Sequence, residues 1–200
     1  MSRPRGDHRE RREAIAQAAA EVIAARGLEG LTLRAVATAL GVTTGVLTHY
    51  FPSKDALLRH TKELAFDRGY AEARAAADGP PGLDRVHAVV EAILPLDRAR
   101  RTRWRLLLAF FGSAVGSASL RRAQERRMQR WYALFQDVVA PLRATGDLAP
   151  GIDPVRVARA ITLFVEGMAI HVVMTAPDAS PAWQRTFARE QVTRLLGGDV

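Results

Sequence analysis

Apolar side chains recur every three or four residues along most of the chain, the period of an α-helix with one buried face. Runs in which apolar and polar residues alternate, as in a half-buried strand, are absent from the sequence. The pattern therefore predicts an all-α protein of about nine helices. The predicted helices cover residues 7–26, 33–40, 44–50, 53–78, 83–93, 96–115, 119–138, 153–175 and 180–196.

Capping and breaking residues place the helix ends. Proline follows the cap at residues 154 and 181, where the first helical position has no use for its missing N–H. The segment 78–82 (Asp-Gly-Pro-Pro-Gly) is the strongest break in the chain, and we expect Pro141 to bend or end a helix. The predicted N-caps are Asp7, Ser53, Ser119, Asp153 and Ser180.

Residues 32–50 have the composition of two short helices that cross at a steep angle. Ala37 provides a small contact, Gly41 provides a sharp turn, and Leu47 anchors the second helix. The second helix leaves exposed the residues Thr43, Thr44, Gly45, Thr48, His49 and Tyr50. Hydroxyl, imidazole and phenol groups suit phosphate oxygens and base edges. The residues alone leave two interpretations, a DNA-reading unit and an ordinary helical hairpin with a polar face.

The segment 41–58 (Gly-Val-Thr-Thr-Gly-Val-Leu-Thr-His-Tyr-Phe-Pro-Ser-Lys-Asp-Ala-Leu-Leu) closely resembles the helix-turn-helix signature of the TetR family of bacterial repressors. The resemblance covers roughly residues 8–58. One position departs from the signature, because Thr48 stands where the family often has tyrosine. The Thr-His-Tyr-Phe variant at 48–51, together with the helix near Trp104, resembles the betaine-regulator-type subgroup.

The resemblance implies a role for each matching residue. Thr44 and Gly45 match positions that touch base edges in the major groove, and Arg34 lies where it could reach the groove edge. A lysine beside a helix N-terminus favours an anion on physical grounds as well, which supports Lys54 as a phosphate ligand. Phe51 is expected to act as a wedge between the DNA-binding unit and the bundle. The positions matching phosphate ligands are Thr32, Thr43, Thr48, His49, Tyr50 and Lys54.

The same resemblance divides the chain into two domains. Residues 1–52 would form a three-helix DNA-binding domain with a basic N-terminal arm, and residues 53–200 a helical domain for ligand binding and dimerisation. The implied partners are a double-stranded DNA operator, a second copy of the chain and a small-molecule effector. Gly167 and Ala169 would allow close helix approach in the dimer. The arm from Arg3 to Arg12 could track phosphates or form a solvated tail.

An effector pocket would draw on aromatic and neighbouring residues of the bundle. Each of them could equally be an ordinary core residue, and a lone histidine on an apolar stripe, such as His87 or His171, is more often hydrogen-bonded in a core. The candidates are Phe66, Tyr70, His87, Trp104, Phe111, Trp131, Phe135, Phe164, Met168 and His171.

The charge balance favours a polyanionic partner without locating its site. Lys and Arg number 29 against 21 Asp and Glu, which gives a net charge of +8. The densest basic stretch, residues 98–130, holds ten Arg against the single acid Glu125. That stretch could be the solvated face of two helices, or a surface for an anionic effector or a second polyanion.

Several classes of protein are excluded. The chain has no cysteine, which removes disulfides, thiolate zinc sites and cysteine nucleophiles. A di-metal bundle needs Glu-x-x-His on two helices, and only Asp84, His87 and Glu91 come near that pattern. No catalytic, cofactor-binding or metal-binding motif is present, no uninterrupted apolar run reaches the ~18 residues of a membrane span, and no apolar signal segment opens the chain.

We therefore expect a cytoplasmic regulator that is not an enzyme, has no cofactor or metal, and contacts no membrane. The sequence favours a repressor that binds a palindromic operator as a dimer and is released by a small, largely apolar ligand. The alternative is a DNA-binding regulator that is controlled by a protein partner, or is constitutive, with no small-molecule pocket.

Overall fold

The structure is a computed structural model that describes residues 5–115, 118–176 and 179–198. These residues form helices joined by turns, with no strand among them. The all-α fold is thus confirmed, and all nine expected helices are present. In chain order the helices are α1 (Arg5–Arg26), α2 (Leu33–Leu40), α3 (Thr44–Tyr50), α4 (Lys54–Ala76), α5 (Leu83–Ile93), α6 (Arg98–Val115), α7 (Ala118–Val139), α8 (Leu142–Thr145), α9 (Pro154–Met174) and α10 (Pro181–Leu195).

Three of the five predicted N-caps, Ser53, Asp153 and Ser180, form side-chain hydrogen bonds to the first turns of their helices. The hydroxyl of Ser53 accepts the N–H of Ala56 at 3.1 Å, and the hydroxyl of Ser180 accepts the N–H of Trp183 at 3.1 Å. The carboxylate of Asp153 accepts the N–H of Val155 at 2.9 Å. These caps satisfy N–H groups that have no partner inside the helix.

Two predicted caps differ from the structure, and one helix is new. Asp7 lies within α1, which begins at Arg5, so an N-cap at Asp7 is wrong. Ser119 is the second residue of α7, and its side chain lies outside the described part of the chain. Pro141 does end α7, but a further single turn, α8, follows it and ends at Gly146.

The chain divides into two compact units, each with its own buried core. Unit 1 contains residues 1–68 and 105–112, and unit 2 contains residues 69–104 and 113–200. Helices α4 and α6 therefore each contribute residues to both units. The predicted functional boundary after residue 52 remains a prediction.

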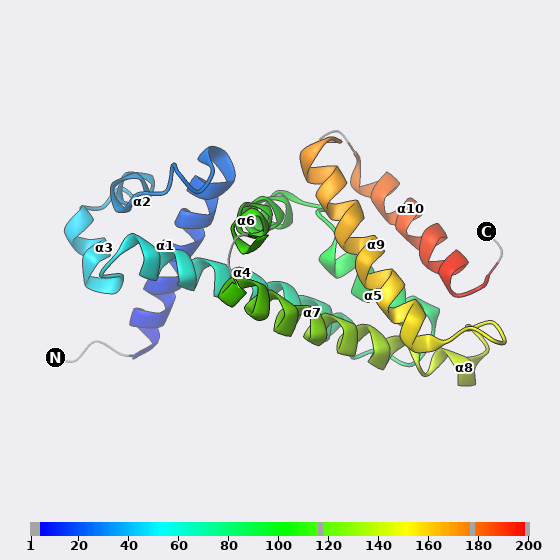
Figure 1. The fold of residues 1–200 in the computed structure, drawn as a ribbon. Coiled ribbons are helices and arrows are strands. Elements are labelled where there is room, and N and C mark those ends of the chain that lie inside the picture. The colour runs from blue at the N-terminus through cyan, green and yellow to red at the C-terminus, as the bar shows by residue number, and fades with distance from the viewer. Residues whose placement is uncertain (1–4, 116–117, 177–178, 199–200) are drawn as a thin grey trace. The chain divides into compact units, whose positions relative to one another are not determined.

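Unit 1 is built on α1, α2 and α3 at the N-terminal end of the chain (Figure 1). Ile15, Val36 and Leu47, one from each helix, are almost fully buried, and Ala37 forms the small contact that the sequence predicted. The core of unit 1 also contains Leu106 and Phe110 of α6. This core holds α2 and α3 in place beneath their polar faces.

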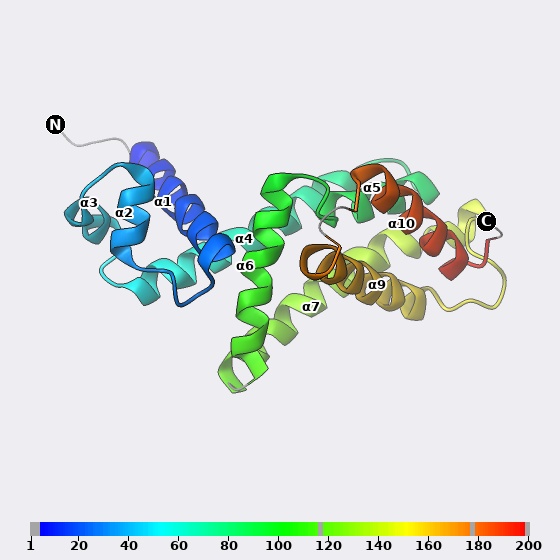
Figure 2. The ribbon, with the colours of Figure 1, turned by 90° about the horizontal axis from the view of Figure 1, so that it is seen from above.

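Unit 2 is a helical bundle in which α9 packs along α7 and beside α10 (Figure 2). Within the described residues, α9 is the one helix long and apolar enough to cross a membrane by length and composition. Its buried side chains, such as Ile161 and Val165, instead belong to the core of unit 2. We therefore interpret α9 as a core helix of the bundle.

Candidate nucleic-acid interface

Local chemistry fixes the turn between α2 and α3. The hydroxyl of Thr32 caps α2 by accepting the N–H of Ala35 at 3.0 Å. Gly41 ends α2 with a φ of 66°, a left-handed conformation that costs glycine little. The N–H of Val42 then bonds to the carbonyl of Ala37 at 3.0 Å, which closes the turn. The turn is therefore set before α3 begins.

The outer face of α3 collects the side chains that the sequence singled out. Thr43, Thr44, Thr48 and His49 are all exposed. Tyr50 is half-buried at the end of the helix. Gly45 is exposed too, and a Cβ placed there would meet only the hydroxyl of Thr43, at 3.7 Å. Nothing inside the protein therefore requires glycine at position 45.

The threonines predicted to bind phosphate, Thr32, Thr43 and Thr48, differ in how their hydroxyls are engaged within the protein. Thr43 is the N-cap of α3 but makes no side-chain cap bond. Thr32 uses an oxygen lone pair on its cap, which leaves its hydroxyl proton for an outside acceptor. Thr48 donates to the carbonyl of Gly45 at 3.0 Å, so its hydroxyl must rotate before it can donate to a phosphate.

Two basic residues lie on the helices that flank α3. Lys54 is the first residue of α4, directly after the Ser53 cap, and is exposed. Arg34 is exposed on the first turn of α2. Both residues belong to unit 1, the unit in which α3 exposes its threonine hydroxyls. The unit thus offers hydrogen-bonding groups with positive charge on the neighbouring helices.

Two residues of α1 that the sequence did not assign to the interface contact the end of α3. The guanidinium of Arg12 donates through Nη1 to the carbonyl of Tyr50 at 2.7 Å. The same guanidinium lies 4.3 Å from the centroid of the Phe51 ring. The His8 ring lies 4.9 Å from the Tyr50 ring, and 6.5 Å from that of His49. Neither alternative for the basic arm fits Arg12, because this last residue of the arm packs against the end of α3. For the rest of the arm both alternatives stay predictions, and Arg3 lies outside the described residues.

Phe51 belongs to the core of unit 1, where it is 1% exposed. That core also contains Leu57 and Leu106 of the predicted second domain, so the expected wedge between the two predicted domains stays a prediction. The ring of His60 lies 5.3 Å from that of Phe51, and its buried Nε2 has no hydrogen-bond partner among the described groups. Burial, reinforced by the positive charge of Arg12, lowers the pKa of His60.

The ten pocket candidates are distributed over both units. Phe66 and Phe111 belong to unit 1, the first buried and the second half-buried. The other eight belong to unit 2: Tyr70, His87, Trp104, Trp131, Phe135, Phe164, Met168 and His171.

Within unit 2 these candidates have different surroundings. Tyr70 and Trp131 are half-buried, with ring centroids 5.4 Å apart, and the guanidinium of Arg130 lies 4.2 Å from the Tyr70 ring. Phe135 and Met168 are buried in the core. Two candidates lie nearer the surface: Phe164 is half-buried 6.1 Å from Phe187, and His171 is exposed with Nδ1 2.8 Å from the Thr175 hydroxyl.

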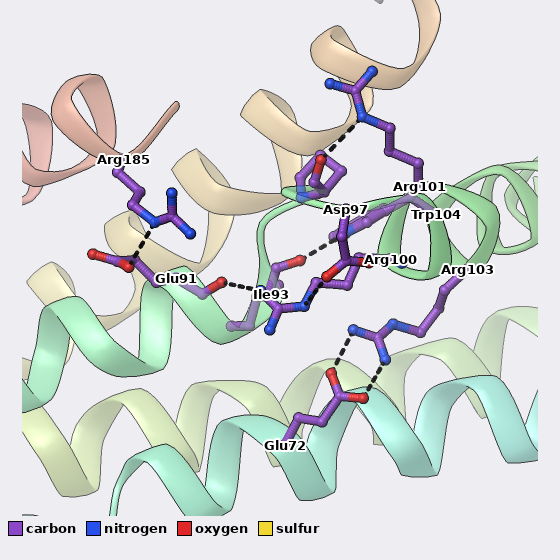
Figure 3. A network of polar contacts seen from close by, with 10 residues as sticks. Glu72, Glu91, Ile93, Asp97, Arg100, Arg101, Arg103, Trp104 and Arg185 are labelled. Carbon is purple, nitrogen blue, oxygen red and sulfur yellow. Dashed lines mark hydrogen bonds and ion pairs between the residues drawn. The ribbon is translucent and has the colours of Figure 1, made fainter. Parts of the chain in front are cut away.

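Trp104 takes part in a polar network at the junction of α5 and α6 (Figure 3). Its indole Nε1 donates to the carbonyl of Ile93 at 2.8 Å. Arg100 donates to the carbonyl of Glu91 at 2.9 Å, and Arg101 to that of Pro95 at 3.2 Å. Side chains of α6 therefore satisfy carbonyls at the C-terminal end of α5 and just beyond it.

The carboxylate of Glu91 ties α5 to α10 in the same network. Arg189 donates to it through Nη2 at 2.7 Å, and Arg185 through Nε at 3.1 Å. Nearby, Arg103 of α6 forms a bidentate pair with Glu72 of α4, at 2.9 and 2.8 Å (Figure 3). Several arginines of the basic run therefore make structural contacts in unit 2.

Two ionisable groups of unit 2 are partly or fully desolvated. His87 is buried, and neither ring nitrogen has a hydrogen-bond partner within the described part of the chain. Burial, followed by the charge of Arg189, lowers the pKa of His87. Burial raises the pKa of Glu166. The guanidinium of Arg159, on the same helix as Glu166, lies 5.1 Å from the centroid of the Tyr132 ring.

Two family models match this chain. The model for bacterial regulatory proteins of the tetR family matches residues 15–61. The model for the C-terminal domain of BetI-type transcriptional repressors matches residues 82–197. Together the two matches cover the helix-turn-helix segment and most of unit 2.

Known proteins resemble the chain over most of its length. HTH-type transcriptional regulator BetI 1 of Chromohalobacter salexigens is 28% identical over 188 residues, which is 93% of this chain and 90% of the relative. HTH-type transcriptional regulator BetI of Burkholderia thailandensis is 34% identical over 142 residues, 67% of this chain and 72% of the relative.

Solved structures share the fold. A transcriptional regulator from Rhodococcus sp. Rha1 superposes with a TM-score of 0.75 at 25% identity, covering 94% of this chain and 98% of that one. A transcriptional regulator from Saccharomonospora viridis in complex with choline has a TM-score of 0.75 at 24% identity, covering 92% and 95% of the two chains.

Proposed function

Because this chain belongs to the TetR family of bacterial regulators and has a BetI-type C-terminal domain, we propose that it is a repressor that binds a palindromic operator as a dimer and is released by a small molecule. As a family member it is a DNA-binding transcriptional regulator and not an enzyme, which implies a cytoplasmic location. The proposal adds the repressor role, the dimer and the effector.

The exposed polar face of α3 is the observation that carries the proposal. Thr44 and Gly45 would meet base edges, since both are exposed at the start of the helix and a Cβ at Gly45 would meet only the Thr43 hydroxyl. Arg34 and Lys54 would bind phosphates of the DNA backbone at the edges of the major groove. The remaining phosphate ligands would be Thr32, Thr43, Thr48, His49 and Tyr50. Residues 1–52 would thus form the DNA-binding domain, and residues 53–200 the rest.

Apolar side chains on α9 and α10 support the dimer. Val155, Leu163 and Met174 of α9 are 49%, 53% and 66% exposed, and Trp183 of α10 is 45% exposed. A Cβ at Gly167 would meet no atom within 4 Å, so this face of α9 is open to a partner. A symmetric partner would bury the same side chains on both copies.

The half-buried aromatic pair of Tyr70 and Trp131 supports an effector site in unit 2. Aromatic faces bind apolar groups and also quaternary ammonium ions. Arg130 already places a cation on the Tyr70 ring, so such a ligand would have to displace it. Choline, which the Saccharomonospora viridis structure contains, is therefore a suitable first probe beside neutral apolar compounds.

The experiment measures DNA binding and its release together. A duplex is first selected from a random pool with the wild-type protein, and its affinity is then titrated with choline and with a panel of neutral compounds. A repressor of this kind loses operator affinity by about 5–150-fold at saturating effector. Binding that no compound changes, and that a protein partner from the host modulates instead, would contradict the effector part of the proposal.

A further inference from the structure

The end of α3 is held by a side chain from α1. We propose that Arg12 is a positioning residue for DNA recognition: it fixes the direction in which α3 presents its side chains, without binding phosphate itself. The inference rests on the proposed role of α3 in reading the operator. It differs from both sequence interpretations of the basic arm.

The guanidinium of Arg12 contacts two consecutive residues at the C-terminal end of α3. It donates to the carbonyl of Tyr50 at 2.7 Å and lies 4.3 Å from the ring centroid of Phe51. A charged donor forms a stronger hydrogen bond than a neutral one, and the planar guanidinium stacks on an aromatic face. Phe51 is also the C-cap of α3, with its N–H bonded to the carbonyl of Leu47 at 2.8 Å. One side chain thus constrains both the last carbonyl and the exit of the helix.

Helix α3 needs an external support of this kind. It has seven residues, and helices this short are marginal in isolation. Its N-cap, Thr43, makes no side-chain bond to the first turn. A positive charge at the C-terminal end of a helix is favourable with the helix dipole. Arg12 supplies that charge and satisfies a carbonyl that has no partner inside the helix.

Helix α1 is a firm base for the contact. Ile15 and Ala19, on the turns that follow Arg12, are almost fully buried in the core of unit 1. Glu13 pairs with Arg68 at 2.9 Å, which ties the same part of α1 to α4. One turn before Arg12, the ring of His8 lies against the ring of Tyr50. The end of α3 is therefore seated on two successive turns of α1.

The neighbouring Arg11 provides a matched control. It is exposed, and no group in the described part of the chain pairs with it, whereas Arg12 is half-buried. Replacing either by glutamine removes the same charge from adjacent positions. The two variants therefore separate the positioning contact from the general electrostatic attraction of DNA.

The test compares Arg12→Gln, Arg12→Lys and Arg11→Gln with wild type. Affinity is measured, over a range of salt concentrations, for the duplex that wild type selects from a random pool and for a scrambled duplex of equal composition. For both Arg12 variants we expect operator affinity to fall by about tenfold or more, the scale of a lost hydrogen bond to a charged group. Arg12→Gln should bind the scrambled duplex with the same affinity as Arg11→Gln. Arg12→Lys, which keeps the charge, should bind the scrambled duplex with the same affinity as wild type.

The readouts separate positioning from the other roles of Arg12. A phosphate ligand would be rescued by lysine, and its loss in Arg12→Gln would lower the salt slope by about 0.9 relative to Arg11→Gln. If Arg12 only stabilised the fold, its loss would lower the melting temperature of the protein and reduce affinity for both duplexes equally. The ratio of operator affinity to scrambled-duplex affinity would then stay unchanged. Either result, or an operator affinity of Arg12→Gln equal to that of Arg11→Gln, overturns the proposal. If wild type selects no duplex, the proposed function itself fails.

Discussion

At the scale of single residues, the candidate interface consists mostly of exposed groups that are available to contact DNA. A Cβ at Gly45 would meet only the Thr43 hydroxyl, at 3.7 Å, and Thr43 does not use that hydroxyl to cap α3. Arg12 is the opposite case, because its guanidinium is engaged within the protein. This difference distinguishes residues that would contact DNA from residues that hold α3 in position.

Replacing Gly45 by alanine tests the close approach of α3 to DNA. Because the added methyl group would meet only the Thr43 hydroxyl, at 3.7 Å, and alanine favours a helix, we expect the melting temperature to stay the same or rise. Operator affinity should fall by about tenfold, the scale of one lost base-pair contact. Gly79→Ala, at an exposed position where a Cβ would meet no atom within 4 Å, is the control. Unchanged operator binding in Gly45→Ala would contradict close approach at this residue.

His60 makes the stability of the protein depend on pH. Its pKa in the folded state is below the ordinary value of 6.5, so below that pH the unfolded chain binds a proton that the folded chain does not. The free energy of unfolding should therefore decrease as the pH falls from 6.5 through the lowered pKa. His60→Phe, which keeps a ring against Phe51, should flatten part of this decrease in denaturant titrations from pH 7.5 to 5. A variant profile identical to that of wild type would show that His60 does not contribute.

At the scale of helices, local chemistry explains what the sequence could predict. The caps at Ser53, Asp153 and Ser180, and the turn at Gly41, each depend on residues within four positions of one another. The sequence does not predict α8, because a proline inside a helical pattern indicates an end or a bend, whereas Pro141 also starts a new turn.

Contacts between distant segments could not be predicted in this way. Arg12 and Tyr50 are 38 positions apart, and nothing in the pattern around either one points to the other. Trp104 shows the same limit, since an aromatic residue on an apolar stripe predicts burial but not that its N–H bonds to Ile93 of another helix. Packing of the folded chain decides these pairings, and the same holds for the placement of Phe51 in the core of unit 1.

The junction of α5 and α6 gives a prediction about Trp104. Trp104→Phe keeps an aromatic ring but leaves the Ile93 carbonyl without its donor, so the free energy of unfolding should fall by about 1–3 kcal/mol. Trp131→Phe, which removes an indole that makes no hydrogen bond within the described chain, should cost less. Denaturant titration of both variants makes the comparison. Equal losses would mean that the bond to Ile93 adds nothing to stability.

At the scale of the whole molecule, recognition of a palindromic operator requires two copies of the chain. A palindromic operator presents two equal half-sites, and a dimer places one recognition helix at each. The exposed apolar side chains of α9 and α10 are the surface in unit 2 that fits this requirement. Effector control would then act on both copies through the same bundle.

Leu163 tests the dimer surface. It is 53% exposed on α9, so Leu163→Glu should fold normally but place two charges in a symmetric interface. We expect a monomer by sedimentation at micromolar concentration, and operator affinity reduced to that of a single half-site. Ala133→Glu, at an exposed position of α7, should remain dimeric. A dimeric Leu163→Glu variant would place the interface elsewhere.

Hydroxyl-radical footprinting on the selected duplex tests most directly whether this chain binds a palindromic operator as a dimer, with α3 as the recognition helix. We expect two protected stretches related by two-fold symmetry, on one side of the duplex and ~10 base pairs or a small multiple apart. We also expect Gly45→Ala to weaken protection equally in both stretches. A single asymmetric protected stretch bound by one chain, or symmetric protection that does not change in Gly45→Ala, would contradict dimeric recognition of DNA through α3.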